Sequence, residues 1–129
     1  MISFIVIGLN EEKFLEDCFN SILETIKQNI IQKWEIIYVD SGSVDRSLEI
    51  AFSNPYIRTY QLYGECNAAV GRNVGAANAT GDILFFIDGD MEIVPEFIPV
   101  VFTKKFRLNY KFVSGQFMNI LYNTKGEFI

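Results

Sequence analysis

The chain has 129 residues, of which 50% are hydrophobic, and a formal net charge of −5. This length predicts a single domain over residues 1–129 with enough apolar material for a core, which excludes an intrinsically disordered chain. Phosphate backbones are bound by basic surfaces, so a net negative charge without a Lys/Arg cluster argues against nucleic acid as a partner. The chain has no histidine, which argues against the usual zinc sites and against histidine-activated nucleophiles.

The cysteines and the apolar segments indicate the compartment. Cys18 and Cys66 lack C-x-x-C spacing and are predicted to be buried, reduced thiols of a cytosolic protein. A strand pattern begins at Ile2, which leaves no room for a secretory signal, and no apolar run approaches the roughly 20 residues that span a bilayer. We expect a cytoplasmic location, with any peripheral contact at the inner face of the membrane made through missing regions or through partners.

Strands and helices are predicted to alternate along the chain. Apolar runs predict buried strands at residues 2–7, 34–39 and 83–87, and a further strand is predicted at residues 57–62, after the turn signal Asn54-Pro55. Apolar residues at helical spacing from Phe14 to Ile26 predict a long amphipathic helix, with Asn10 as its cap and Glu11 and Glu12 in its first turn. Further helices are predicted at residues 45–52, 68–80 and 95–107, and residues 110–122 have strand-like stretches.

This order predicts an α/β fold in which a mostly parallel sheet carries helices on both faces, because helices of crossover length separate buried strands. In such sheets, ligands bind beyond the carboxyl ends of the strands. Asn10, Asp40, Asp88 and Asp90 each follow a predicted strand. We therefore expect these four residues to lie at one site.

Asp88-Gly89-Asp90 offers two carboxylates one residue apart, directly after the most hydrophobic predicted strand. Mg²⁺ and Mn²⁺ prefer oxygen ligands and are commonly held by one or two carboxylates together with substrate phosphates. A solvated turn is the alternative interpretation. The buried strand favours a metal site, since it holds both acids rigidly at the ligand-binding edge of the sheet.

Two further segments carry candidate ligand-binding residues. After the second strand, Ser43 and Asp45 are predicted to cap the next helix, which leaves Asp40 free to hydrogen-bond a base or a ribose. Arg72 lies in a helix rich in Ala and Gly that is expected to pack against the sheet. A solvated surface position is one interpretation of Arg72, and a position along the cleft facing a pyrophosphate is the other.

Residues 3–23, 38–45 and 71–90 resemble successive blocks of the family 2 inverting glycosyltransferases, in order and with suitable spacing. The resemblance implies a Rossmann-like GT-A fold, Mn²⁺ or Mg²⁺ as cofactor, a nucleoside-diphosphate sugar as donor, with a UDP-sugar favoured, and a glycan, lipid or other acceptor. It implies that Asp90 is the principal metal ligand and that Asp88 contacts ribose or metal. The implied nucleotide-binding residues are Gly8, Leu9, Asn10, Glu11, Asp40, Arg72 and Asp88.

The chain departs from the family pattern at three points. Leu9 stands where the family often has a Tyr that could stack on a base, and Ser41 stands where it often has a second acid. Family catalytic domains usually continue well beyond this length and find their general base there, so we expect a truncated portion whose catalytic base lies beyond residue 129. A nucleotide-sugar-binding fragment without catalytic activity is therefore an alternative. Residues 85–90 also resemble the Asp-x-Asp strand of haloacid-dehalogenase-like phosphatases, although Met91-Glu92 follow where that family has Gly-Thr.

Overall fold

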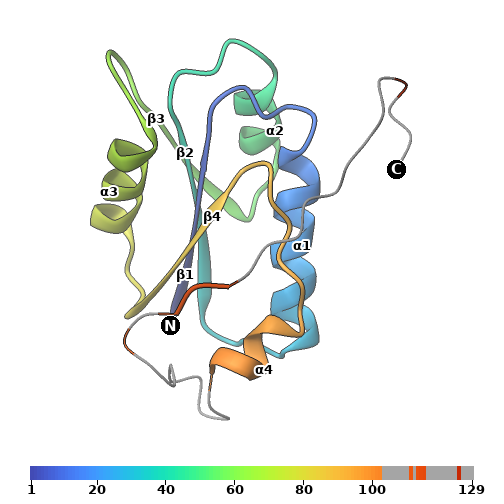
Figure 1. Ribbon diagram of the computed structural model, residues 1–129. Coiled ribbons are helices and arrows are strands. Elements are labelled where there is room, and N and C mark those ends of the chain that lie inside the picture. Colours follow the sequence, from blue (N-terminus) through green and yellow to red (C-terminus); the bar gives the residue numbers. More distant parts are fainter. Residues whose placement is uncertain (103–110, 112, 116–124, 126–129) are drawn as a thin grey trace.

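The computed structural model describes residues 1–102, 111, 113–115 and 125 (Figure 1). Within these residues, four strands form one sheet in the order β3-β2-β1-β4, and every neighbouring pair is parallel. The strands are β1 (Ile2–Gly8), β2 (Trp34–Asp40), β3 (Ile57–Gln61) and β4 (Ile83–Asp88). The predicted α/β fold with a parallel sheet is confirmed.

The helices cover both faces of this sheet, as predicted. They are α1 (Leu15–Gln28), α2 (Ser47–Ser53), α3 (Ala68–Asn78) and α4 (Phe97–Val101). Figure 1 shows α3 on one face of the sheet and α1 and α2 on the other. Alternate residues of β1 supply the two cores: Phe4 and Val6 pack in the cluster that includes α1, and Ile5 and Ile7 pack in the cluster on the α3 side.

Helix α3 lies close against the sheet because two glycines four positions apart share its inner face. Gly71 and Gly75 are both buried. A Cβ atom added at Gly75 would overlap Cγ2 of Ile5, and one added at Gly71 would lie 3.3 Å from Cγ2 of Ile7. The predicted close packing of this small-residue helix is confirmed, and it brings Arg72, the neighbour of Gly71, to the edge of the sheet.

The first helix begins later than predicted, at Leu15. Asn10 has a φ of 55°, which lies in the left-handed region, and its side-chain oxygen accepts a hydrogen bond from the amide of Val44 instead of capping a helix. The prediction that Asn10 caps α1 with Glu11 and Glu12 in its first turn is therefore wrong. The side chain is used to join two loops.

The remaining boundaries differ by small amounts. Helix α2 begins at Ser47, α3 ends at Asn78, and β3 ends at Gln61. Of the predicted 95–107 helix, α4 covers residues 97–101, and Phe102 is already extended. Residues 103–107 lie outside the described part of the chain, as do most of residues 110–122.

The cysteine prediction is half right. Cys18 is buried and free, and Cys66 is free but only half-buried. Burial, with nearby acids adding to it, raises the pKa of the Cys18 thiol to about 12, so this thiol stays protonated. Among the described residues, no helix combines the length and apolarity needed to cross a bilayer.

The amino end of the sheet is closed by a hydrogen-bond network around Glu35. Its carboxylate accepts hydrogen bonds from the Ser3 hydroxyl at 2.6 Å and from the Thr80 amide at 2.6 Å, and it pairs with Arg58 at 3.1 Å. The Ser3 oxygen in turn accepts the amide of Gly81 at 2.9 Å. Burial acts to raise the pKa of Glu35, but the bonds from Ser3 and Thr80 and the charge of Arg58 outweigh it and hold the pKa below its usual value.

Candidate functional site

The parallel strands end at one edge of the sheet, where the loops after β1, β2 and β3 lie together at the upper end of Figure 1. The strand register pairs Gly8 of β1 with Asp40 of β2, and Ile7 of β1 with Asp88 of β4. The expectation that these predicted site residues share one edge is confirmed for their backbone positions.

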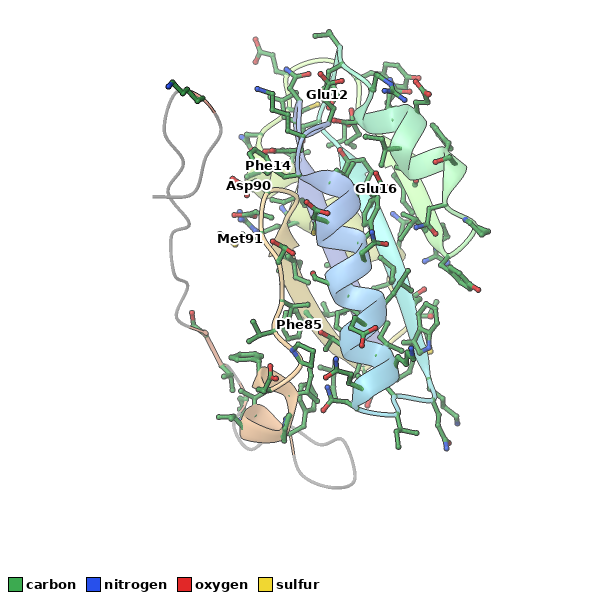
Figure 2. All side chains as sticks on the ribbon, turned by 90° about the vertical axis from the view of Figure 1, so that its right-hand side faces the viewer. Glu12, Phe14, Glu16, Phe85, Asp90 and Met91 are labelled. Carbon is green, nitrogen blue, oxygen red and sulfur yellow. The ribbon has the colours of Figure 1, made fainter. Side chains whose placement is uncertain are left out.

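The acidic triplet forms a tight turn at the end of β4. The amide of Gly89 donates to the Ile7 carbonyl at 2.8 Å, and the amide of Met91 donates to the Asp88 carbonyl at 2.9 Å. Gly89 is buried, whereas Asp88 is half-buried and Asp90 is exposed. The triplet lies near the start of α1 (Figure 2), since a Cβ added at Gly89 would sit 3.3 Å from Cδ1 of Leu15. The turn therefore fixes its backbone to the sheet and presents the two carboxylates at the surface.

Arg72 and Asp88 form an ion pair, with 2.9 Å between the guanidinium nitrogen and the carboxylate oxygen. Each side chain keeps 41% of its surface exposed. A half-exposed pair of this kind contributes little to stability, roughly 1 kcal/mol or less, because water screens it. The cation and one acid that the sequence analysis selected separately are thus in contact, and the guanidinium remains accessible to a second anion.

Glu11 adds a further carboxylate to this edge. Its side chain lies below the triplet, since a Cβ added at Gly89 would sit 3.4 Å from its Cγ atom. Burial and the negative charges of Asp90, Asp45 and Asp88 raise the pKa of Glu11. The edge therefore concentrates negative charge, which a bound cation would relieve.

The donor set suits a hard divalent cation that completes its coordination with phosphate oxygens. Asp88 and Asp90 provide carboxylate oxygens only, as Mg²⁺ and Mn²⁺ prefer. Within the described residues, no group of three or more Asp, Glu, Cys or His side chains is arranged to hold a metal ion by itself. A metal at this edge would depend on ligands from the substrate.

Asp40 is not free, contrary to the sequence prediction. It is fully buried. Its carboxylate accepts hydrogen bonds from the Tyr38 hydroxyl at 2.8 Å, the amides of Gly42 and Ser43 at 3.0 and 2.7 Å, and the Ser43 hydroxyl at 2.6 Å. Burial, followed by the bond to Asp40, raises the pKa of Tyr38, so its hydroxyl remains a donor. In this structure Asp40 organises the turn after β2.

The loops after β1 and β2 are joined by reciprocal hydrogen bonds, which the sequence analysis did not predict. The bonds are Asn10 N to Ser43 Oγ (2.8 Å), Val44 N to Asn10 Oδ1 (2.9 Å), Glu11 N to Ser47 Oγ (2.9 Å), Glu12 N to Asp45 Oδ2 (3.1 Å) and Arg46 N to Glu12 Oε2 (3.1 Å). Ser43 is therefore not a helix cap as predicted. Asp45 does accept the amide of Ser47, at 2.9 Å, at the start of α2. Ser43 and Asp45 in the loop after β2, together with Asn10 and Glu12 in the loop after β1, were the available signal.

A groove of about 450 Å³ lies elsewhere, between α1 and α2, and its lining includes Phe19, Leu23, Arg46, Ile50 and Tyr56. None of the acids of the triplet lines it. Its volume alone does not make it the functional site, because the clustered charges lie at the edge of the sheet.

A parallel α/β sheet with paired carboxylates and an arginine at its carboxyl edge carries its charged side chains where sheets of this class bind their ligands. The sequence profile of glycosyl transferase family 2 matches residues 3–128, and the chain belongs to this family. The sheet and its helices have the Rossmann-like GT-A fold, as the resemblance implied. Family membership leaves the phosphatase interpretation without support.

Two curated relatives illustrate the match. Glycosyltransferase GlyG of Streptococcus pneumoniae is 29% identical over 123 residues, which cover 92% of this chain and 40% of the relative. An undecaprenyl-phosphate 4-deoxy-4-formamido-L-arabinose transferase of Pectobacterium carotovorum is 34% identical over 106 residues, which cover 76% of this chain and 31% of the relative. The chain thus spans less than half the length of these relatives.

Two solved structures show the same fold with ligands. S. aureus TarS 1–349 in complex with UDP-GlcNAc has a TM-score of 0.64 and 27% identity, over 77% of this chain and 29% of that one. Glucosyl-3-phosphoglycerate synthase from Mycobacterium tuberculosis, in complex with Mn²⁺, UDP and glucosyl-3-phosphoglycerate, has a TM-score of 0.57 and 27% identity, over 78% of this chain and 38% of that one.

Proposed function

We propose that this chain is the donor-binding part of an inverting, metal-dependent glycosyltransferase, which transfers a sugar from a nucleoside diphosphate to an acceptor hydroxyl. The observation that carries the proposal is the meeting of Asp88, Asp90 and Arg72 at the carboxyl edge of the sheet. The UDP-GlcNAc complex of TarS and the Mn²⁺ and UDP complex of the mycobacterial synthase support a UDP-sugar as donor and Mn²⁺ or Mg²⁺ as cofactor.

Each residue at the edge has a proposed role. Asp90 is exposed and is assigned as the principal metal ligand, while Asp88 contacts the metal or the ribose. Arg72 binds a phosphate oxygen, to which its planar guanidinium is suited. The nucleoside lies against the loop from Gly8 to Glu11. A direct contact from Asp40 stays a prediction, and it would require one of the carboxylate's present hydrogen bonds to be exchanged.

The proposed reaction is a single displacement at the anomeric carbon. The acceptor oxygen forms a bond to this carbon as the bond to the diphosphate oxygen breaks, and a carboxylate base removes the acceptor proton. A bound divalent cation supplies charge neutralisation for the departing diphosphate. Arg72 stabilises the same developing charge from the α3 side. The base is expected beyond residue 129, and a glycan, a lipid or another hydroxyl compound is the acceptor.

Nucleotide-sugar binding without transfer is the second candidate. At this edge Asp88 pairs with Arg72, Asp90 is the proposed metal ligand, and Glu11 lies among other acids. None of these three carboxylates is assigned as the base. This candidate shares the donor site with the first one and differs only in the outcome for the sugar.

Two measurements test these functions. Thermal unfolding with UDP, with and without Mn²⁺, should show stabilisation that depends on both, because a ligand of the folded state raises its apparent stability. Incubation of the chain with UDP-sugars and acceptors then separates transfer from binding alone, since only transfer yields a glycoside. Absence of any UDP effect in the presence of Mn²⁺ would refute the donor site itself. A cytoplasmic location, including contact with the inner face of a membrane, is part of the proposal for the whole protein.

A further inference from the structure

Tyr63 has the most exposed aromatic side chain among the described residues, with 84% of its surface accessible. An exposed aromatic ring offers its faces to a planar partner. Leu9 in the β1–α1 loop is also exposed, at 50%, but offers an aliphatic surface. The residues from Gly8 to Glu11 therefore supply no aromatic face for a nucleotide base.

Backbone contacts fix Tyr63 at the carboxyl edge of the sheet. The amide of the preceding residue, Leu62, donates to the carbonyl of Asp40 at 2.8 Å, which extends the pairing of β3 with β2 by one bond. Gly64 follows with a φ of 85°, a left-handed conformation that turns the chain toward α3. The thiol of Cys66 donates to the carbonyl of Gly64 at 3.4 Å within this turn. The ring therefore stands on a defined loop next to Asp40.

The ring is held by its tip and is open on its faces. The Tyr63 hydroxyl donates to the side-chain oxygen of Gln61 at 3.1 Å. Gln61 is the register partner of Asp40, so both side chains lie on the same face of the sheet. This tether restricts the ring without covering it, which favours stacking because less conformational freedom is lost on binding.

The order of the strands gives the separation of β3, which ends two residues before Tyr63, from β4, which ends at Asp88. In the order β3-β2-β1-β4, Tyr63 follows one outer strand and Asp88 ends the other. Three spacings of about 4.8 Å separate these strands, or roughly 14 Å along the edge. An extended nucleoside diphosphate spans such a distance. With its phosphates at Asp88 and Arg72, its base would point toward β2 and β3.

We propose that Tyr63 stacks on the base of the bound nucleotide and provides the aromatic surface that the β1–α1 loop lacks. This inference rests on the proposed function, since it assigns the base end of the same donor site. Stacking on an aromatic side chain is worth roughly 1–3 kcal/mol per base and does not depend on the identity of the base. Tyr63 therefore adds affinity for the nucleoside and makes no contribution to binding of the phosphates.

Titration calorimetry of the 129-residue chain tests this, with UDP and with pyrophosphate as separate ligands, each in the presence of Mn²⁺. We expect Tyr63→Ala to weaken UDP binding roughly ten- to hundred-fold and to leave pyrophosphate binding unchanged. Tyr63→Phe keeps both ring faces and should bind UDP within about threefold of the wild type. Tyr56→Ala is the matched control, because Tyr56 is also exposed, at 59%, but packs on Trp34 before β3 begins.

The outcomes separate this inference from the function on which it rests. If the wild type binds UDP and Tyr63→Ala binds it equally well, the stacking role is wrong and the donor site stands. Equal weakening of UDP and pyrophosphate in Tyr63→Ala would also overturn stacking, since it would show that the ring acts through the folding of the loop. If the wild type binds pyrophosphate but not UDP, or neither of them, the donor site and the role of Tyr63 fail together.

Discussion

The two ends of the sheet place their acidic side chains in different electrostatic surroundings. At the amino end, Glu35 receives hydrogen bonds from Ser3 and Thr80 and an ion pair from Arg58, and its pKa is lowered. At the carboxyl end, burial and neighbouring acids raise the pKa of Glu11. The comparison indicates that one end uses its negative charge to hold the fold together, while the other tolerates an electrostatic cost.

The direction of each pKa shift says whether the ionised carboxyl group stabilises or destabilises the fold. A carboxyl group whose pKa is raised on folding destabilises the folded state when it is ionised, whereas one whose pKa is lowered stabilises it. Uncompensated charge at the edge where a parallel sheet binds its ligands is a sign of a binding site. Substitutions at the carboxyl end should therefore change ligand binding, and those at the amino end should change stability.

The largest effect is expected for Asp90→Asn, which keeps the shape of the side chain but removes its charge. Loss of residues that only support a metal ligand costs roughly 10–100-fold, so loss of the principal ligand should weaken Mn²⁺-dependent UDP binding more than 100-fold. Because Asp90 is exposed, the free energy of unfolding should stay within about 0.5 kcal/mol of the wild type. Calorimetry and urea denaturation measure the two quantities. Unchanged UDP binding in this variant would contradict the metal assignment.

The next effect is expected for Arg72→Ala, which removes the cation of the carboxyl end. A hydrogen bond to a charged group is worth about 1.5–3 kcal/mol, so UDP affinity should fall roughly 10–150-fold. The pair with Asp88 is 41% exposed on each side, and the loss of stability should stay below about 1 kcal/mol. Arg72→Lys keeps the charge without the planar fork and should give an intermediate affinity. If Arg72→Ala lost much stability but bound UDP normally, Arg72 would serve the fold and not ligand binding.

At the amino end, Glu35→Gln should lower the free energy of unfolding by about 1–2 kcal/mol. The amide replaces a carboxylate oxygen with a donor that faces Arg58, and one charge-assisted interaction is lost. UDP affinity should be unchanged. Asp82→Asn serves as the control, because Asp82 pairs with the amino terminus of the chain with 79% of its side chain exposed, and it should change the free energy of unfolding less than Glu35→Gln does. Urea denaturation at neutral pH compares the three proteins.

The smallest effect is the pH dependence of the difference in unfolding free energy between the wild type and Glu35→Gln. The pKa of Glu35 is lowered on folding, so its stabilisation is present above its unfolded pKa of about 4.3 and is lost as the pH falls through the lower folded value. The difference in unfolding free energy between wild type and Glu35→Gln should therefore shrink as the pH is taken below about 4.3. Effects of other carboxyl groups cancel in the difference. A difference that stays constant in this range would show that the ionisation of Glu35 is not its source.

Most of the fold could be predicted because the hydrophobic pattern determines it. β1 and β2 are buried along most of their length, as expected for parallel strands with both faces covered. The predicted burial of β4 is wrong, because β4 is an outer strand of the described sheet and leaves Leu84 and Phe86 exposed. The start of α1 was mispredicted because Asn10, an ordinary helix cap by sequence, adopts a left-handed conformation to reach the next loop. Such contacts join residues that are distant in sequence, and no local pattern reports them.

The sequence predicted which residues lie at the site better than it predicted their hydrogen bonds. Strand-end positions placed Asp88, Asp90 and Asp40 at one edge, and the small residues of α3 indicated that Arg72 lies nearby. The contacts of Asp40 were only partly predictable, because they depend on the turn that brings the amides of Gly42 and Ser43 to its carboxylate as well as on the hydroxyl of Tyr38. Alternation along β2 already placed Tyr38 on the same face as Asp40, which was the available signal.

The reciprocal bonds between the loops after β1 and β2 also have a consequence for local opening. Asn10 and Ser43 each bind the other's segment, so neither loop can detach without breaking the bonds of both. We therefore expect the two loops to open as one unit, with similar rates of amide exchange. A nucleotide bound to the β1 loop as proposed should also slow exchange at Val44 and Arg46, without touching either residue.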